Sequence, residues 1–213
     1  MKDLSSGKAA YKLILFLAVL LTAALATIYY TPSDKPTETE IPLAVFAGER
    51  ATHLFTAPPY ISPKILKAMM PSLSGDFPGM TRIDLNVAIA SQKYKCDIEV
   101  KETQDGHSLV VCSEENSWLA YYCVGMSDSG IIPLYFADNG GGSGTFCSVL
   151  LVRLEVEDDH MTIERVDKIS LGDRWLGSLR VEKNELLIET DLTRSHTRFG
   201  PEDGDGKGRV RLD

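Results

Sequence analysis

The cysteines are the residues of this chain whose chemistry depends most on its compartment: Cys96, Cys112, Cys123 and Cys147. None of them forms a C-x-x-C pair, so the spacing supports neither a zinc ribbon nor a thioredoxin-like motif. An even number in an exported chain predicts two disulfides, with three possible connectivities. Cys96 and Cys112 flank the turn at Asp105-Gly106 almost symmetrically, so we expect them to pair across a hairpin. That pairing leaves Cys123 for Cys147. Four buried free thiols are the alternative.

A glycine-rich stretch, DNGGGSG at residues 138–144, invites a phosphate-binding or hydrolase interpretation. It lacks the P-loop lysine, and a strand pattern rather than a helix follows it, so no helix N-terminus could receive a phosphate. Ser143 lies between glycines, but the order is not G-x-S-x-G and the strand-to-helix turn is absent. We therefore expect a wide hairpin loop. Its polar residues Asp138, Asn139 and Ser143 are candidates for a binding surface.

Asp173-Arg174-Trp175 is the most distinctive tripeptide, and it indicates a corner of the chain. Trp175 could join Trp118 and Tyr121 or Tyr122 in an aromatic platform that binds a sugar or a peptide. On that basis Trp175 is a fourth candidate for the binding surface. Packing in the core is the favoured alternative, because a large apolar ring at a corner usually caps the interior.

Metal and carboxylate chemistry has little support in the sequence. The histidines are dispersed over predicted turns without ligand spacing: His53, His107, His160 and His196. Residues 203–208 are similar to a calcium loop, but Lys207 occupies the fifth position, which leaves at most weak calcium binding by an acidic tail. Glu155 and Glu157 project from one strand face, as the solvated side of a sheet does. We expect no cofactor and no metal site.

Composition limits the partners. The chain has 213 residues and a formal net charge of -8. The first 26 residues hold three lysines and one aspartate, so the remainder is more acidic than the whole. Because phosphate neutralisation needs clustered Lys and Arg, nucleic acid is excluded as a partner. The same charge disfavours electrostatic docking on anionic lipid.

One stretch predicts the location of the protein. Eighteen residues, from Leu13 to Tyr30, contain no charge, glycine or proline. As a helix they would span about 27 Å, close to a hydrocarbon core of about 30 Å. Residues 1–12 carry lysines and should stay in the cytoplasm, which places the rest outside the cytoplasm. We expect a single-pass membrane anchor. Cleavage after Ala26, which would release a secreted or periplasmic protein, is the alternative.

The remaining chain divides into a linker at residues 31–42, a β domain at residues 43–194 and a flexible tail at residues 195–213. Within the linker, Pro, Thr and acidic residues lack apolar periodicity. One short helix is expected, with Ser62 as N-cap, Pro63 at the first helical position and Pro71 after its end. A first strand is expected near residues 43–46.

Period-two alternation and short apolar runs predict strands from Arg82 onward: residues 82–89, 96–101, 109–112, 118–124, 131–137, 150–157, 161–171, 178–182 and 185–190. Residues 131–137 are apolar on both faces, so we expect them to form a central strand. The alternation breaks near Arg165-Val166, as at a bulge. Lys183-Asn184 should turn the last hairpin, where Asn184 can tolerate the left-handed conformation. Residues 210–212 could pair at a sheet edge. Short strands with frequent turns predict a mostly β fold, an antiparallel sandwich or small barrel.

Three segments together resemble a pattern found in exported bacterial proteins to which no activity is attached. They are residues 140–146 (GGGSGTF), residues 150–155 and residues 171–175 (LGDRW), and the resemblance covers roughly residues 118–189. It implies β structure and export, and it transfers no site residues.

We therefore expect a non-catalytic extracytoplasmic β domain tethered to the membrane. It would act as an envelope interaction or accessory module for a protein or glycan. An exported hydrolase, with glycans as its candidate substrates, and a small-ligand carrier are the alternatives.

Overall fold

The computed structural model describes residues 51–71, 76–157, 160–191 and 207–213. The segments predicted as the cytoplasmic N-terminus, the membrane anchor at residues 13–30, the linker and the strand near residues 43–46 lie outside these described residues. Within the described part of the chain, no helix combines the length and the apolar character that crossing a bilayer requires.

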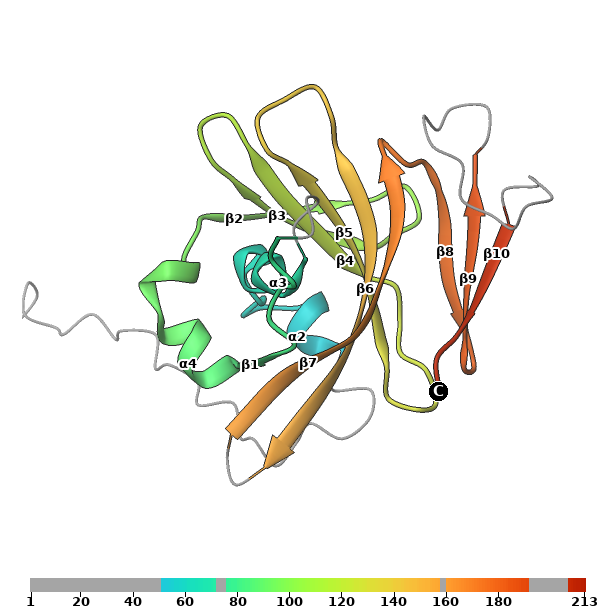
Figure 1. The fold of residues 1–213 in the computed structure, drawn as a ribbon, viewed down its shortest axis with the longest axis horizontal. Helices are drawn as coiled ribbons and strands as arrows, with labels where there is room; N and C mark the ends of the chain where they lie inside the picture. The colour runs from blue at the N-terminus through green and yellow to red at the C-terminus, as the bar shows by residue number, and fades with distance from the viewer. Residues whose placement is uncertain (1–50, 72–75, 158–159, 192–206) are drawn as a thin grey trace, which may run out of the picture. The chain divides into compact units, whose positions relative to one another are not determined.

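The strands form two antiparallel sheets, which confirms the predicted mostly β class (Figure 1). The larger sheet has the order β1-β7-β6-β5-β4-β3-β2, so it is open, with β1 and β2 at its edges. Its members are β1 (Arg82–Asp84), β2 (Ile98–Glu102), β3 (Ser108–Ser113), β4 (Trp118–Cys123), β5 (Ile132–Asn139), β6 (Phe146–Glu157) and β7 (His160–Asp173). The smaller sheet has the order β10-β9-β8, with β8 (Gly177–Glu182), β9 (Glu185–Thr190) and β10 (Lys207–Arg211).

Short helices precede and interrupt the first strands: α2 (His53–Thr56), α3 (Pro63–Met69), α4 (Leu85–Ala90) and the 3-10 helix η3 (Gln92–Tyr94). Helix α3 forms as predicted. Ser62 is its N-cap, with a side chain that accepts a hydrogen bond from the Lys64 backbone N–H, and Pro63 occupies its first turn. The expectation of a single short helix was wrong, because α2 and α4 are present as well.

Helix α4 replaces most of the strand predicted at residues 82–89. Strand β1 ends at Asp84, whose carboxylate accepts a hydrogen bond from the Val87 backbone N–H and so caps the helix. Leu85 and Ala88, three residues apart, are buried, whereas Val87 and Ile89 are 65% and 52% exposed. This burial follows the helical repeat, and the apparent alternation in the sequence was misleading.

Each face of the large sheet carries its own hydrophobic core. The helix-side core lies between the helices and one face, and includes Phe55, Ile65, Leu66, Met69, Leu85, Val110, Tyr121, Cys123, Leu134, Leu150 and Ile163. The sheet-side core lies between the opposite face and the small sheet, and includes Ala137, Cys147, Val149, Leu151, Leu171, Trp175, Leu179, Leu186, Ile188 and Leu212. Two facing sheets with a filled interior are consistent with the predicted sandwich.

The central strands follow the predictions closely. β5 lies in the middle of the large sheet and buries residues on both faces, as its continuous apolar run predicted. On β7, Arg165 pairs with Val152 and Asp167 pairs with Leu151. Val166 is therefore an extra residue opposite the β6 ladder, which confirms the bulge expected at this position.

The C-terminal part differs from the predictions in two details. The β8–β9 hairpin turns at residues 183–184 as expected, but Lys183, with φ 56°, takes the left-handed conformation that the sequence indicated Asn184 could tolerate. Residues 207–211, placed in the flexible tail, form β10 and pair with β9. The expected pairing of residues 210–212 at a sheet edge is confirmed for residues 210 and 211. Leu212 is fully buried, and this burial explains why the strand is held at the sheet edge.

Candidate functional site

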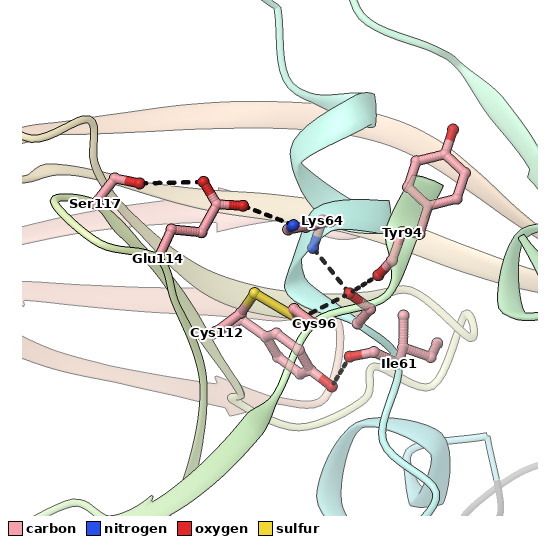
Figure 2. Close-up of a disulfide and its surroundings, with 9 residues drawn as sticks. Ile61, Lys64, Tyr94, Cys96, Cys112, Glu114 and Ser117 are labelled. Carbon is pink, nitrogen blue, oxygen red and sulfur yellow. Dashed lines mark hydrogen bonds and ion pairs between the residues drawn. A yellow bond between two sulfur atoms is a disulfide. The ribbon is translucent and has the colours of Figure 1, made fainter. Parts of the chain in front are cut away.

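Cys96 and Cys112 form the disulfide that the sequence predicted, with Cα atoms 6.0 Å apart. Cys96 lies two residues before β2, and Cys112 is the β3 partner of Ile98. The bond therefore fastens the start of the edge strand to its neighbour. Figure 2 shows Lys64 of α3 and Tyr94 beside it. Ser62 Oγ donates a hydrogen bond to the Tyr94 carbonyl at 2.6 Å and lies 3.4 Å from Cys96 Sγ.

The second predicted disulfide is wrong, because Cys123 and Cys147 are free and buried. Cys123 belongs to the helix-side core and Cys147 to the sheet-side core, so their side chains leave opposite faces of the same sheet. Strand β5 also separates the two strands that carry them. Burial raises the pKa of Cys123 to about 12, and burial raises the pKa of Cys147 as well. Both thiols are therefore poor nucleophiles at neutral pH.

A groove with a volume of about 230 Å³ lies between α3 and the adjacent ends of β3, β4 and β5. Its lining combines two lysines of α3 with polar and apolar residues of the sheet: Lys64, Lys67, Cys112, Glu114, Ser117, Trp118, Leu119, Asp138, Asn139 and Gly140. Cys112, Leu119 and Asp138 are neighbours in successive strand ladders, so they present one row to the groove. The disulfide therefore forms part of the groove wall.

Two ion pairs join α3 to the sheet across this groove. Lys64 Nζ lies 2.6 Å from Glu114 Oε1, and Lys67 pairs with Asp138. The hydrogen bond and the positive charge of Lys64 hold the pKa of Glu114 below its ordinary value. The carboxylate of Asp138 is only 20% exposed, whereas Lys67 is 48% exposed. Charged groups of both signs thus line the opening, and solvent reaches them.

Asn139 organises the glycine-rich loop. Its amide nitrogen donates to the Gly144 carbonyl at 3.0 Å, and its amide oxygen accepts from the Gly141 backbone N–H at 3.0 Å. Across the loop, Asp173 accepts a hydrogen bond from the Thr145 backbone N–H at 2.7 Å. The hydrogen-bonding groups of Asn139 are therefore used within the chain, and its predicted role as a ligand-binding group is better assigned to loop structure. Ser143 is exposed on the same loop.

Trp175 does not lie on a binding surface. It is 4% exposed within the sheet-side core, and its indole N–H donates to Thr190 Oγ1 at 2.9 Å. Tyr121 is fully buried on the other face, where its hydroxyl donates to the Ile61 carbonyl at 2.9 Å. The aromatic platform is therefore wrong, because Trp175 and Tyr121 are buried, and packing of Trp175 in the core, the favoured alternative, is confirmed.

A different aromatic row does form. The rings of His107 and Tyr122, and of Tyr122 and Tyr135, stack with centroids 4.8 Å apart. Tyr135 also donates a hydrogen bond to Cys147 Sγ at 3.1 Å. Because Tyr122 stacks with a ring on each side, its ring faces are not open to a ligand. Tyr122 and Tyr135 are cross-strand partners, a relation that the sequence alone could not give.

The structure thus places Asp138 and Asn139 at the groove and leaves Ser143 and Trp175 outside it. The sequence prediction missed Lys64, Lys67 and Glu114. The two lysines are three residues apart on a predicted helix, a spacing that puts side chains on one helical face. That spacing was the available signal. No protein-family model, curated protein or solved structure matches this chain.

Proposed function

We propose that this chain is an extracytoplasmic interaction module, anchored in the membrane through residues 13–30, and that a protein partner binds at the groove between α3 and the sheet. The observation that carries the proposal is the pair of ion pairs at the groove, Lys64 with Glu114 and Lys67 with Asp138. A partner side chain of either sign can exchange with one member of each pair. The four ionisable groups offer charges of both signs with which the charged side chains of a protein partner can pair.

The size of the groove supports a surface interaction. A volume of about 230 Å³ lies below the range of about 300–1,000 Å³ that is usual for sites enclosing a whole small molecule. It suits one side chain of a larger partner. The space between the two sheets, where a carrier would hold its ligand, is filled by the sheet-side core. Among the functions considered, binding of a partner at the surface is therefore favoured over a carrier that encloses its ligand.

The disulfide supports the extracytoplasmic part of the proposal, since such bonds persist in oxidising compartments. Alkylation of the full chain from its native membrane fraction, followed by intact mass measurement, tests it. We expect two thiols to react after denaturation without reduction, which are Cys123 and Cys147. The other two should react only after reduction. Four reactive thiols without reduction would contradict the disulfide and the compartment together.

Photocrosslinking tests the groove. Gly140 lines it and has open space where a Cβ would lie, so a benzoylphenylalanine fits there. Ser178 is exposed on β8 and serves as the remote control position. We expect a protein adduct from position 140 that is absent from position 178 and is lost with Lys67→Glu. An adduct that persists in the Lys67→Glu protein, or that forms equally at both positions, would refute binding at the groove.

A further inference from the structure

The outer edge of β2 is a second surface of interest. β2 terminates the large sheet, and within the described residues no strand pairs with its outer side. All five of its residues are exposed, including Ile98 at 39% and Val100 at 42%. An exposed strand edge presents unpaired N–H and C=O groups and is a template for another strand.

The opposite edge of the same sheet is protected in ways that β2 is not. There, β1 is three residues long, and β7 carries register shifts at two places. Short strands and bulges are common means of preventing edge pairing. In contrast, β2 pairs with β3 over five consecutive residues without a shift. The Cys96–Cys112 disulfide also fixes the chain just before β2 to β3, so the edge strand is held in place for pairing with another strand.

The charged residues of β2 determine which strand, and in which register, can pair with its outer edge. Glu99 and Lys101 lie on one face of the strand and form an ion pair at 3.0 Å, with side chains 63% and 55% exposed. A two-fold axis perpendicular to the sheet at Val100 would set Val100 against itself in a second copy. Glu99 would then face Lys101 of the second copy, twice. Centring the axis on either neighbouring residue would instead oppose two glutamates or two lysines.

We propose that β2 pairs antiparallel with β2 of a second copy of this chain, centred on Val100, and joins two seven-stranded sheets into one. A lone lysine in an edge strand normally discourages pairing, but in this register the second copy supplies a glutamate. Five residues make a small interface, so association should be weak in dilute solution. A shared membrane raises the effective concentration, and this last step rests on the proposed anchor.

Cysteine crosslinking of the full chain in its native membrane tests the register. Directly opposed strand residues have Cα atoms about 4.5–5.5 Å apart, within the range that a disulfide spans. We expect Val100→Cys to give a covalent dimer under mild oxidation. Val166→Cys is the matched control, since Val166 is 41% exposed on β7, beside the opposite edge strand, and Val100 is 42% exposed. Dimer yields from Val100→Cys no higher than from Val166→Cys would overturn the proposal.

Charge reversal tests the pairing itself. In the Val100→Cys background, Glu99→Lys or Lys101→Glu should each lower the dimer yield by about tenfold, because two opposite-charge pairs become like-charge pairs. The double variant should restore the yield. Co-expression of the two single variants should also restore it, as mixed dimers. A double variant as low as the single variants would contradict the register. If the adduct at Gly140 persists while no dimer forms, this inference fails and the proposed groove remains.

Discussion

Breaking the Cys96–Cys112 bond should destabilise the domain by an amount that the structure allows us to estimate. The two cysteines are 16 residues apart in sequence. In the chain-entropy account, a closed loop of about this length contributes about 3 kcal/mol. For a domain of this size, about 2–4 °C of melting temperature corresponds to each kcal/mol. Reduction should therefore lower the melting temperature by about 6–12 °C.

The loss of stability on breaking the bond should differ between parts of the fold. β2 is exposed throughout and lies at the sheet edge, whereas β5 and β6 lie inside the sheet and carry core residues on both faces. Without the bond, β2 should open locally at a lower free energy than the whole domain. Hydrogen exchange measured with and without reductant should show faster exchange in peptides covering residues 96–113. Peptides covering residues 132–139 should change much less.

A double variant, Cys96→Ala with Cys112→Ala, distinguishes the effect of losing the disulfide from any other effect of the reductant. Its melting temperature should not respond to reductant, because Cys123 and Cys147 are already free thiols. Two results would refute the reasoning. One is a native protein whose melting temperature changes by less than about 1 °C on complete reduction, far below the estimate. The other is equal acceleration of exchange in the two regions.

Three further predictions concern the cores. Trp175→Ala should lower the free energy of unfolding by about 3–5 kcal/mol in a denaturant titration, and Trp175→Phe by less, although Thr190 then loses its hydrogen-bond donor. Tyr121→Phe should cost about 1–2 kcal/mol in the same titration, because the Ile61 carbonyl loses its buried partner. Burial raises the pKa of Cys123 from 9.0 to about 12. Its contribution to stability is therefore complete below about pH 9 and is lost as the pH rises toward 12, and Cys123→Ala should make the alkaline decline measured by chemical denaturation shallower.

Local signals explain what the sequence predicted correctly. Ser62 and Pro63 mark the start of α3, and Pro71 marks the limit beyond its end. Strands β5 and β6 follow from unbroken or alternating apolar residues. The bulge at Val166 follows from a break in alternation, and the first disulfide from cysteines placed evenly about a turn. Each of these signals lies within about twenty residues of chain, where backbone geometry limits the possible partners.

The errors arise where short patterns are ambiguous or where distant strands meet. In the six residues of α4, alternation and helical spacing both describe the apolar positions, and the capping contact of Asp84 decides between them. Two things decide whether Cys123 can reach Cys147. One is the face of the sheet on which each side chain lies, and the other is the order of the strands in the sheet. Neither can be read from spacing. For Trp175, the favoured expectation of core packing was correct, and only the alternative of a binding surface was wrong.

The groove could not have been predicted from any one segment. Lys67 comes from α3, Glu114 from the turn after β3, and Asp138 from the end of β5. The sequence indicated Asp138 only as part of a polar loop. Its ion-pair partner at the groove, Lys67, is 71 residues away in the sequence.

The position of the disulfide connects the two proposed surfaces. Cys112 forms part of the groove wall, and Cys96 holds the start of the exposed strand β2. One covalent bond therefore stabilises a wall of the groove and the edge at which a second copy would pair. Loss of the bond should weaken the adduct at Gly140 and the Val100→Cys dimer together, while the sheet-side core stays packed. An oxidising compartment is then a condition for binding through both surfaces, and not only for stability.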